Sequence, residues 1–284
     1  NEYKKLYPDN YHGKNLDWPD YGKNEYGEAA TRHVRYEYAS LMSMCDHYLG
    51  KVLDMMDRYD LWKDTMLIVN TDHGFMLGEK EWMGKNVQPM YEELIYDPRN
   101  PIQGERRNQL AQTIDIVPTL AEFFQIAPPE YMDGHSLTPV IRNDTPIRDY
   151  ALFGIFGGHI CITDGRYVYM RSCKDPENQP LYEYTAMPCH MDRPFSREEM
   201  SEAELCDKNA FNFMKKSGVF KVPVHHSTDS YRFGTMLFDL LTDPEQKCPI
   251  HDSNIEDHLC QAMKKMMKDN QAPKEQFERI GLTE

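Results

Sequence analysis

Apolar side chains recur at intervals of three or four residues between about positions 28 and 59. The positions that carry them are Val34, Tyr38, Leu41, Cys45, Tyr48, Leu49, Val52, Met56 and Tyr59. This spacing places the apolar residues along one face of a helix, so it predicts a long amphipathic helix. A short loop then leads into an apolar run over 65–71, which predicts a buried strand. A helix followed closely by such a strand is typical of an α/β domain.

Two further helices are predicted from the same kind of spacing. One runs from Gln112 to Phe124, with Asp115 placed to cap it and Pro118 in its first turn. The other lies near the C-terminus and carries apolar residues at helical intervals. These residues are Ile255, Leu259, Met263 and Met266. We interpret the Met-rich stretch 263–267 as helix packing and surface.

Beyond residue 150 the apolar runs become shorter, which predicts strands separated by turns. The runs are Ala151–Phe156, His159–Thr163, Tyr167–Met170 and Met236–Leu240. Asp164-Gly165 between two of them is typical of a hairpin. Residues 172–232 are polar with little periodicity. The change in pattern predicts two domains, an α/β domain over 1–147 and a small α+β domain with an antiparallel sheet over 148–284.

The composition restricts the class of partner. Forty-six Asp and Glu against 32 Lys and Arg give a net charge of −14. An acidic chain lacks the basic face that nucleic-acid binding requires, so we predict no nucleic-acid partner. No apolar run reaches the length of a membrane span, so none is predicted. The oligomeric state is not indicated by any pattern.

The seven cysteines are scattered and include no C-x-x-C pair. This distribution is typical of free thiols rather than of a disulfide framework or a zinc site, and it favours a cytoplasmic location. The chain opens on Asn1 rather than on Met. A periplasmic or secreted protein therefore stays open as an alternative.

The residues with the clearest chemistry follow the predicted strand directly. Asp72-His73-Gly74 would lie at the carboxyl end of a central strand, where open α/β sheets place their ligands. Lys85, after Gly84, is close enough in sequence to return to the same crevice. A carboxylate, an imidazole and an ammonium group suit a metal and an anionic oxygen group. An Asp after a strand is also a common turn cap, so the motif alone leaves both interpretations open.

Several motifs together resemble those of the sulfatase family. The first group consists of Asp72-His73-Gly74, Leu77-Gly78-Glu79, Gly84-Lys85 and Tyr91-Glu92-Glu93. The second group lies further along the chain and consists of Asp115–Leu120, Asp133–Leu137, Asp164–Tyr167 and Leu237–Pro244. The resemblance covers most of residues 25–252. It implies the alkaline-phosphatase-like α/β sandwich, here its C-terminal part, followed by the small α+β domain.

The resemblance also implies an activity and the residues that serve it. Sulfatases are sulfuric ester hydrolases, so the expected substrate is a sulfated small molecule or glycan. In that family the Asp and the His or Asn of the strand-end motif bind a divalent metal, usually calcium, and the Lys contacts sulfate. Carried over by position, Asp72 and His73 become metal ligands, and Lys85 becomes a catalytic and substrate-binding cation. Because imidazole is a less natural calcium ligand, magnesium or manganese stays open.

The family's nucleophile motif is not found among the cysteines. That nucleophile is a Cys or Ser, oxidised to formylglycine, within C/S-x-P/A-x-R. None of the seven cysteines has this context, although Cys189 is followed by Arg193 at the right distance. The Asp pair that completes the family's metal site is not found either. We therefore expect this chain to be the C-terminal part of a longer sulfatase and inactive by itself. The alternatives are a phosphate or phosphonate ester hydrolase of the same superfamily and a non-catalytic fragment.

Other residues are weaker candidates. His159, after Gly157-Gly158, is placed to face substrate from the small domain. Lys80 we interpret as solvated. His225-His226, and His190 beside Cys189, indicate metal binding only by composition. The segment from Glu92 to Pro98 is several residues shorter than its strand-containing counterpart in the family, which indicates a deletion or missing residues.

Overall fold

The computed structural model describes residues 2–16, 19–71, 73–85, 94–190, 193–214, 217–225 and 230–283. The chain packs into two compact units, Asn1–Arg106 and Arg107–Glu284, and each has its own core. Residues 107–147 therefore pack with the residues that follow them. The domain boundary near residue 147, which came from the change in sequence pattern, stays a prediction.

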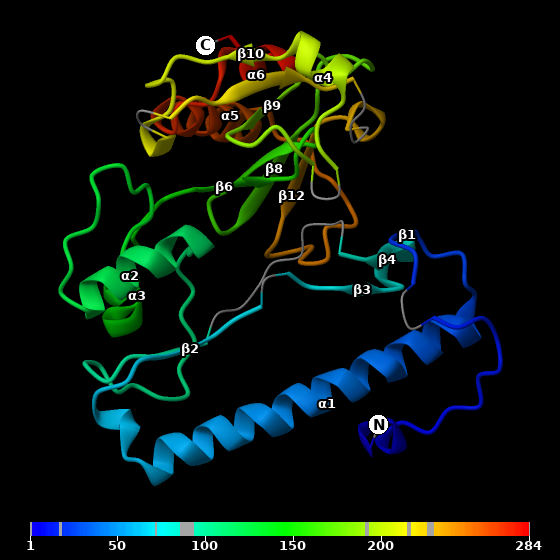
Figure 1. The fold of residues 1–284 in the computed structure, drawn as a ribbon, viewed down its shortest axis with the longest axis vertical. Helices are drawn as coiled ribbons and strands as arrows, with labels where there is room; N and C mark the ends of the chain where they lie inside the picture. The colour runs from blue at the N-terminus through cyan, green and yellow to red at the C-terminus, as the bar shows by residue number, and fades with distance from the viewer. Residues whose placement is uncertain are drawn as a thin grey trace. The chain divides into compact units, whose positions relative to one another are not determined.

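The first unit is built along one long helix (Figure 1). Helix α1 (Glu28–Arg58) confirms the predicted amphipathic helix to within one residue. The 3₁₀ helix Leu61–Lys63 leads from it into β2 (Leu67–Val69). Strand β2 pairs antiparallel with β5 (Leu94–Tyr96), with Val69 opposite Leu94.

The strand predicted over 65–71 is confirmed but is only three residues long. The expectation of a central strand is wrong for the described residues, because β5 is the one strand that pairs with β2 there. The segment from Glu92 to Pro98, which appeared too short, nonetheless contains strand β5. The strand has three residues, and each pairs with one residue of the equally short β2.

A second small sheet in the first unit has the order β1-β4-β3. Its strands are β1 (Gly22–Lys23), β3 (Met76–Leu77) and β4 (Trp82–Gly84). The sheet packs on the N-terminal part of α1 around four buried side chains. These are Leu16, Ala30, Val34 and Met83, with Phe75 and Leu77 packed against them. Burial of these apolar groups stabilises the hairpin that carries the candidate site.

The second unit begins with the 3₁₀ helix Thr113–Asp115 and α2 (Ile116–Phe123), followed by α3 (Thr138–Asn143). The helix predicted over 112–124 is confirmed, with Pro118 buried in its first turn. Asp115 occupies the predicted N-cap position of α2, but its side chain makes no cap hydrogen bond to that helix. It serves the preceding 3₁₀ turn instead, where Gln112 is the N-cap residue and Asp115 accepts its backbone N–H at 2.7 Å as the other half of a capping box.

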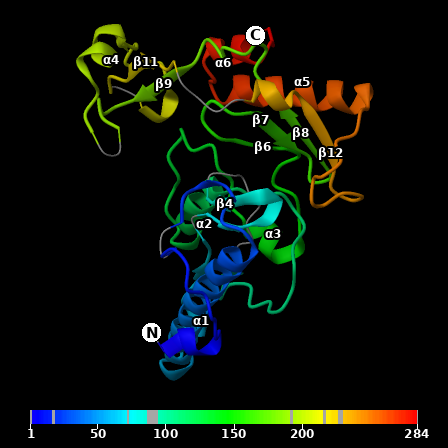
Figure 2. The ribbon, with the colours of Figure 1, turned by 90° about the vertical axis from the view of Figure 1, so that its right-hand side faces the viewer.

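The main sheet of the second unit is antiparallel, in the order β12-β8-β7-β6, and confirms the four predicted strands. Its members are β6 (Ala151–Gly154), β7 (Ile160–Thr163), β8 (Tyr167–Arg171) and β12 (Met236–Asp239). Helix α5 (Ser253–Asp269) lies on one face of this sheet, with α6 (Lys274–Arg279) beyond it (Figure 2). The core between them is formed by Ile162, Tyr169, Leu237, Leu259, Met263, Met267, Phe277 and Ile280.

The polar stretch 172–232 contains structure that periodicity did not predict. It forms a second antiparallel sheet with the order β10-β11-β9. The strands are β9 (Tyr182–Thr185), β10 (Glu204–Leu205) and β11 (Phe220–Pro223). All four residues of β9 are half-buried, so no alternation of polar and apolar residues marks the strand. The sequence did contain a signal that could have predicted helix α4 (Arg197–Glu202), namely the capping box of Ser196 and Glu199.

Candidate functional site

The candidate site lies at the open end of the β3–β4 hairpin. Met76 pairs with Gly84 and Leu77 with Met83, so the chain runs back antiparallel toward His73. The hairpin is fixed to α1, because Arg35 Nε donates a 2.8 Å hydrogen bond to the Leu77 carbonyl. This register is what returns Lys85 to the residues that follow β2.

Lys85 and His73 meet at this point. Lys85 Nζ lies 3.3 Å from His73 Nε2, and His73 Nδ1 lies 3.0 Å from the Gly74 carbonyl oxygen. An ammonium group can only donate, so Nε2 is the accepting nitrogen and Nδ1 carries the hydrogen. Thr71 Oγ1 donates to the His73 carbonyl at 2.7 Å and holds the backbone. Metal-binding histidines commonly have one nitrogen anchored to a carbonyl in this way, with the other turned to the ion.

The structure thus brings together two of the residues that the sequence singled out. Asp72 and Tyr91-Glu92-Glu93 lie outside the described residues. The described part of the chain contains no group of three or more His, Cys, Asp or Glu that could hold a metal ion. His73 offers one nitrogen of the right chemistry, and its role as a ligand, like that of Asp72 and Lys85, stays a prediction.

His159 belongs to the second unit, just before β7. Its Nε2 donates a 2.9 Å hydrogen bond to the Gly234 carbonyl oxygen. Burial lowers the pKa of this imidazole, and the nearby Arg279 guanidinium adds to the shift, while the hydrogen bond to Gly234 opposes it. The ring is therefore neutral at pH 7 and already engaged at Nε2. A substrate contact by His159 stays a prediction.

The remaining weak candidates have ordinary partners. His190 Nε2 lies 2.7 Å from Glu199 Oε1, and His225 Nε2 lies 3.1 Å from Glu202 Oε2. Lys80 is exposed, as predicted. His226 lies outside the described residues. The His–carboxylate pairs are single contacts, so they give no support to the metal sites that composition indicated.

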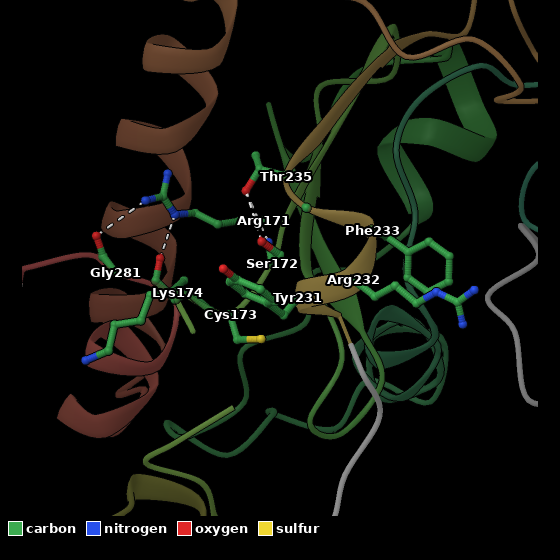
Figure 3. Close-up of a pocket in the computed structure, with 11 residues that line it drawn as sticks. Arg171, Ser172, Cys173, Lys174, Tyr231, Arg232, Phe233, Thr235 and Gly281 are labelled. Atoms are coloured by element: carbon green, nitrogen blue, oxygen red, sulfur yellow. Dashed lines mark hydrogen bonds between the residues drawn. The ribbon is translucent and has the colours of Figure 1, made fainter. Parts of the chain in front are cut away.

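The second unit contains a cavity of about 690 Å³ that sequence reasoning did not single out (Figure 3). Arg171, Lys174 and Arg232 are among its lining residues, and none of the 11 is acidic. Arg171 donates from Nε to the Ile280 carbonyl at 2.8 Å and from Nη2 to the Gly281 carbonyl at 3.3 Å. These hydrogen bonds supply donors to the two backbone carbonyl groups that directly follow α6. The guanidinium therefore holds the fold together and has few donors left for a ligand.

Two motifs of the family resemblance pack directly against each other. The fully buried Asp115 carboxylate accepts the backbone N–H of His135 at 2.9 Å and forms a bidentate pair with Arg148. Thr119 Oγ1 accepts the Leu137 N–H at 2.8 Å. A Cβ at Gly134 would collide with the Ile114 carbonyl oxygen. Residues 115–120 and 133–137 therefore form one interlocked structural element.

The other two motifs are joined in the same way. Arg166 Nη2 donates to Asp239 Oδ2 at 2.9 Å, and its Nε donates to Oδ1 at 3.2 Å. Asp239 Oδ1 also accepts the Leu241 N–H at 3.0 Å. The Arg166 guanidinium holds the pKa of Asp239 below its usual range. Asp164 Oδ1 closes the hairpin by accepting the Tyr167 N–H at 2.7 Å. These motif residues therefore hold β8 to β12.

Comparison with known proteins identifies the class. Residues 2–126 match the family model described as Sulfatase. This match covers α1, the β3–β4 hairpin and the strand-end residues, so this part of the chain is similar to the sulfatases of the alkaline-phosphatase-like superfamily.

Individual relatives agree with this family. An arylsulfatase of Clostridium perfringens is 30% identical over 149 residues, which are 47% of this chain and 30% of that protein. A multifunctional alkaline phosphatase superfamily protein of Trinickia caryophylli is 30% identical over 124 residues, which are 42% of this chain and 24% of that protein. The chain therefore spans about a quarter to a third of the length of these relatives.

Solved structures support the fold. A protein in complex with its substrate D-glucosamine-2-N,6-O-disulfate aligns with a TM-score of 0.58 at 17% identity. The alignment covers 87% of this chain and 44% of that one.

Among the described residues no helix combines the length and the apolar character needed to cross a membrane.

Proposed function

We propose that this chain is part of a sulfuric ester hydrolase in which Lys85 binds the sulfate group and Asp72 and His73 bind a divalent metal. The observation that carries the proposal is the convergence of the Lys85 ammonium and the His73 Nε2 at 3.3 Å. Two groups that approach each other from the ends of β2 and β4 define a point where an anion and a cation can be bound side by side.

The chemistry of each group suits this role. Lys85 is a compact positive charge that matches a tetrahedral oxyanion and stabilises charge that develops on its oxygens. His73 is held by its Nδ1 contact to Gly74, so its Nε2 is oriented in advance for a metal. A bound divalent ion would polarise the sulfate oxygens. We propose calcium, with magnesium or manganese as alternatives, and the remaining ligands must come from oxygen groups.

A phosphate or phosphonate ester hydrolase is the second candidate. The similarity to the Trinickia protein, a member of the wider alkaline phosphatase superfamily, favours it. For the sulfatase reading, the neighbour solved with a disulfated glucosamine supports a sulfated sugar as substrate. A non-catalytic fragment is the third possibility.

The test compares Lys85→Ala with Lys80→Ala in a protein that also contains the residues encoded upstream of Asn1. Lys80 is an exposed lysine on the same hairpin, so it is a matched control. We expect Lys85→Ala to lower kcat/KM on 4-nitrophenyl sulfate by roughly 10²–10³, about 2.7–4 kcal/mol of transition-state stabilisation. Lys80→Ala should change it less than threefold.

Three results would contradict the proposal. A loss below threefold for Lys85→Ala would mean that this side chain does not contact the sulfate. Faster hydrolysis of 4-nitrophenyl phosphate or of a phosphonate ester would favour the second candidate. Residues 1–284 alone should hydrolyse none of these esters, because their cysteines lack the nucleophile motif. Turnover by this chain would show that it carries another nucleophile.

A further inference from the structure

Arg279 of α6 is a buried cation whose hydrogen-bond acceptors are all neutral. The residue is 2% exposed. Its Nη1 lies 3.3 Å from the Gly157 carbonyl oxygen, 3.1 Å from that of Gly158 and 2.9 Å from Asn178 Oδ1. Its Nε donates to Gln276 Oε1 at 3.1 Å. A buried charge without a counter-ion is costly, so this arrangement indicates a role other than stability.

The carbonyl groups that Arg279 binds belong to the loop between β6 and β7, directly before His159. The Gly157 carbonyl oxygen also accepts a 2.7 Å hydrogen bond from Asn178 Nδ2. Both glycine residues of the loop are buried, so these hydrogen bonds replace those that water would make. Arg279 and Asn178 therefore hold the loop in one conformation and fix the position of the residue that follows it.

The imidazole of His159 is held in one tautomer. Its Nε2 lies 2.9 Å from the Gly234 carbonyl oxygen, and only a nitrogen that carries a hydrogen can make this contact. In the neutral ring Nδ1 is therefore the acceptor. No residue in the described part of the chain forms a hydrogen bond to this nitrogen, and the side chain is half-buried. The imidazole thus offers one unused acceptor.

The charge of Arg279 preserves this acceptor. Protonation of the ring would turn Nδ1 from an acceptor into a donor. Burial lowers the pKa of His159 and the Arg279 guanidinium lowers it further, against the opposing effect of the hydrogen bond to Gly234. A guanidinium stays charged at any physiological pH, so its effect on the imidazole is constant.

The other charged or titratable groups on these segments do not offset the guanidinium charge. Burial raises the pKa of the Cys161 thiol on β7 to about 12, so this group is neutral. Arg232, on the segment that carries the acceptor carbonyl, is also positive. Glu278 of α6 is exposed and pairs with Lys174 Nζ at 3.6 Å. The environment of the imidazole is therefore positive, which disfavours a second proton on the ring.

We propose that Arg279 is a positioning residue, which fixes the loop and holds His159 as a neutral acceptor for a hydroxyl group of the substrate. The inference rests on the proposed function, in which the substrate is a sulfate ester, and it identifies the part of that ester that His159 contacts. A sulfate group has only acceptor oxygens, so it cannot donate to Nδ1, whereas a sugar hydroxyl can. The substrate class is therefore a sulfated compound with free hydroxyl groups.

The variant Gln276→Glu tests the effect of the charge while Arg279 stays in place. The new carboxylate keeps the acceptor for Nε and adds a counter-ion, so the pKa of His159 should rise by about 0.5–1 unit. The measurement is an NMR titration of residues 1–284 labelled with ¹⁵N-histidine, with His159→Gln used to assign the signals. Gln271→Glu is the matched control, because Gln271 is exposed and accepts the Asn212 N–H at 2.9 Å instead.

The control should change the pKa of His159 by less than about 0.2 unit, since an exposed charge is screened. Equal shifts in the two variants, or no shift in either, would show that Arg279 does not act on the imidazole. The spectra of the wild type should also show hydrogen on Nε2 alone at pH 7. Hydrogen on Nδ1 at that pH would overturn the proposal.

The variant Arg279→Lys separates the charge from the geometry. An ammonium group cannot reach the loop carbonyls and Gln276 at the same time, but it keeps the positive charge. The pKa of His159 should therefore stay within about 0.2 unit, while the Gly158 amide hydrogen exchanges at least about tenfold faster. Unchanged exchange would show that Arg279 does not hold the loop.

The ligand is tested by calorimetry in the longer protein that includes the residues encoded upstream of Asn1. The probes are glucosamine 6-sulfate and inorganic sulfate. His159→Phe removes one neutral acceptor, so it should weaken binding of the sugar by roughly three- to tenfold. Binding of inorganic sulfate should change less than about twofold, because it has no hydroxyl group to donate.

Each other result contradicts the proposal. Equal weakening of both probes would place His159 on the sulfate group, and no weakening of either would remove it from the site. A protein that binds inorganic sulfate but not the sugar would overturn the substrate class. Neither the titration nor the calorimetry needs turnover, so failure here is distinct from failure of the proposed hydrolysis.

Discussion

The end of the β3–β4 hairpin and the interlocked element around Asp115 both contain motifs of the same family, but they are built on opposite principles. Lys85 is exposed and His73 is half-buried, and they meet through one contact of 3.3 Å. Asp115 is fully buried, and its carboxylate accepts hydrogen bonds from Gln112, His135 and Arg148. The hairpin end keeps its polar groups accessible, whereas the element around Asp115 buries its carboxylate and pairs it with hydrogen-bond donors.

The difference shows that a resemblance in sequence can have two physical causes. Groups that bind an ion or a substrate must keep donors and acceptors available, at little benefit to stability. A buried carboxylate must instead be fully paired, because an unpaired one is strongly destabilising. Substitutions should therefore separate the two regions, one through activity and the other through the free energy of unfolding.

The largest expected effect is that of Asp115→Asn. The substitution leaves the Arg148 guanidinium, whose side chain is 8% exposed, without its carboxylate. We expect the free energy of unfolding of the second unit to fall by about 3–5 kcal/mol, as measured by urea denaturation. The exposed Asp133→Asn is the control and should stay within about 0.5 kcal/mol. Equal losses of unfolding free energy in Asp115→Asn and Asp133→Asn would show that the buried carboxylate has no special structural role.

Gly134→Ala should have the next largest effect. Its Cβ would meet the Ile114 carbonyl oxygen, which belongs to the backbone and cannot turn away. We expect a loss of about 1–3 kcal/mol from overpacking, visible as a lower urea midpoint. Gly50→Ala is a control in helix α1, where a new Cβ meets nothing within 4 Å. That change should stabilise the helix by about 0.5–1 kcal/mol.

The Arg166–Asp239 pair should make stability depend on pH. Because Arg166 lowers the pKa of Asp239, the folded state binds fewer protons than the unfolded state near the ordinary value of 3.8. The stabilisation is present above that pH and is lost as the pH falls through the lower folded-state pKa. The urea midpoint of the wild type should exceed that of Asp239→Asn at pH 6, and the gap should narrow below pH 4. A constant gap would show that the pairing contributes no pH dependence.

The smallest expected change in stability is that of Lys85→Ala. Lys85 is exposed and its contact to His73 lies at the surface, so the free energy of unfolding should change by less than about 0.5 kcal/mol. Together with the expected loss of activity, this result would mark the hairpin end as a binding site. A stability loss above about 1 kcal/mol would instead place Lys85 among the structural motif residues.

Local patterns were sufficient for much of the fold. The spacing of apolar residues located α1 and α5, and the short apolar runs located β6, β7, β8 and β12. The order of residues around Gly74 and Gly84 was enough to predict that His73 and Lys85 approach each other. These features depend on neighbours within a helix, a strand or one hairpin, so the sequence alone contains the information that determines them.

Contacts between distant residues were decided only by the tertiary structure. The sheet of β9, β10 and β11 carries no alternating pattern, and its strands are joined across a polar stretch. The partners of Asp115 and Asp239 include arginines 33 and 73 residues away, so the motifs by themselves did not show which groups these carboxylates pair with. Burial removes water as the alternative partner, and only the folded chain determines which groups are buried together.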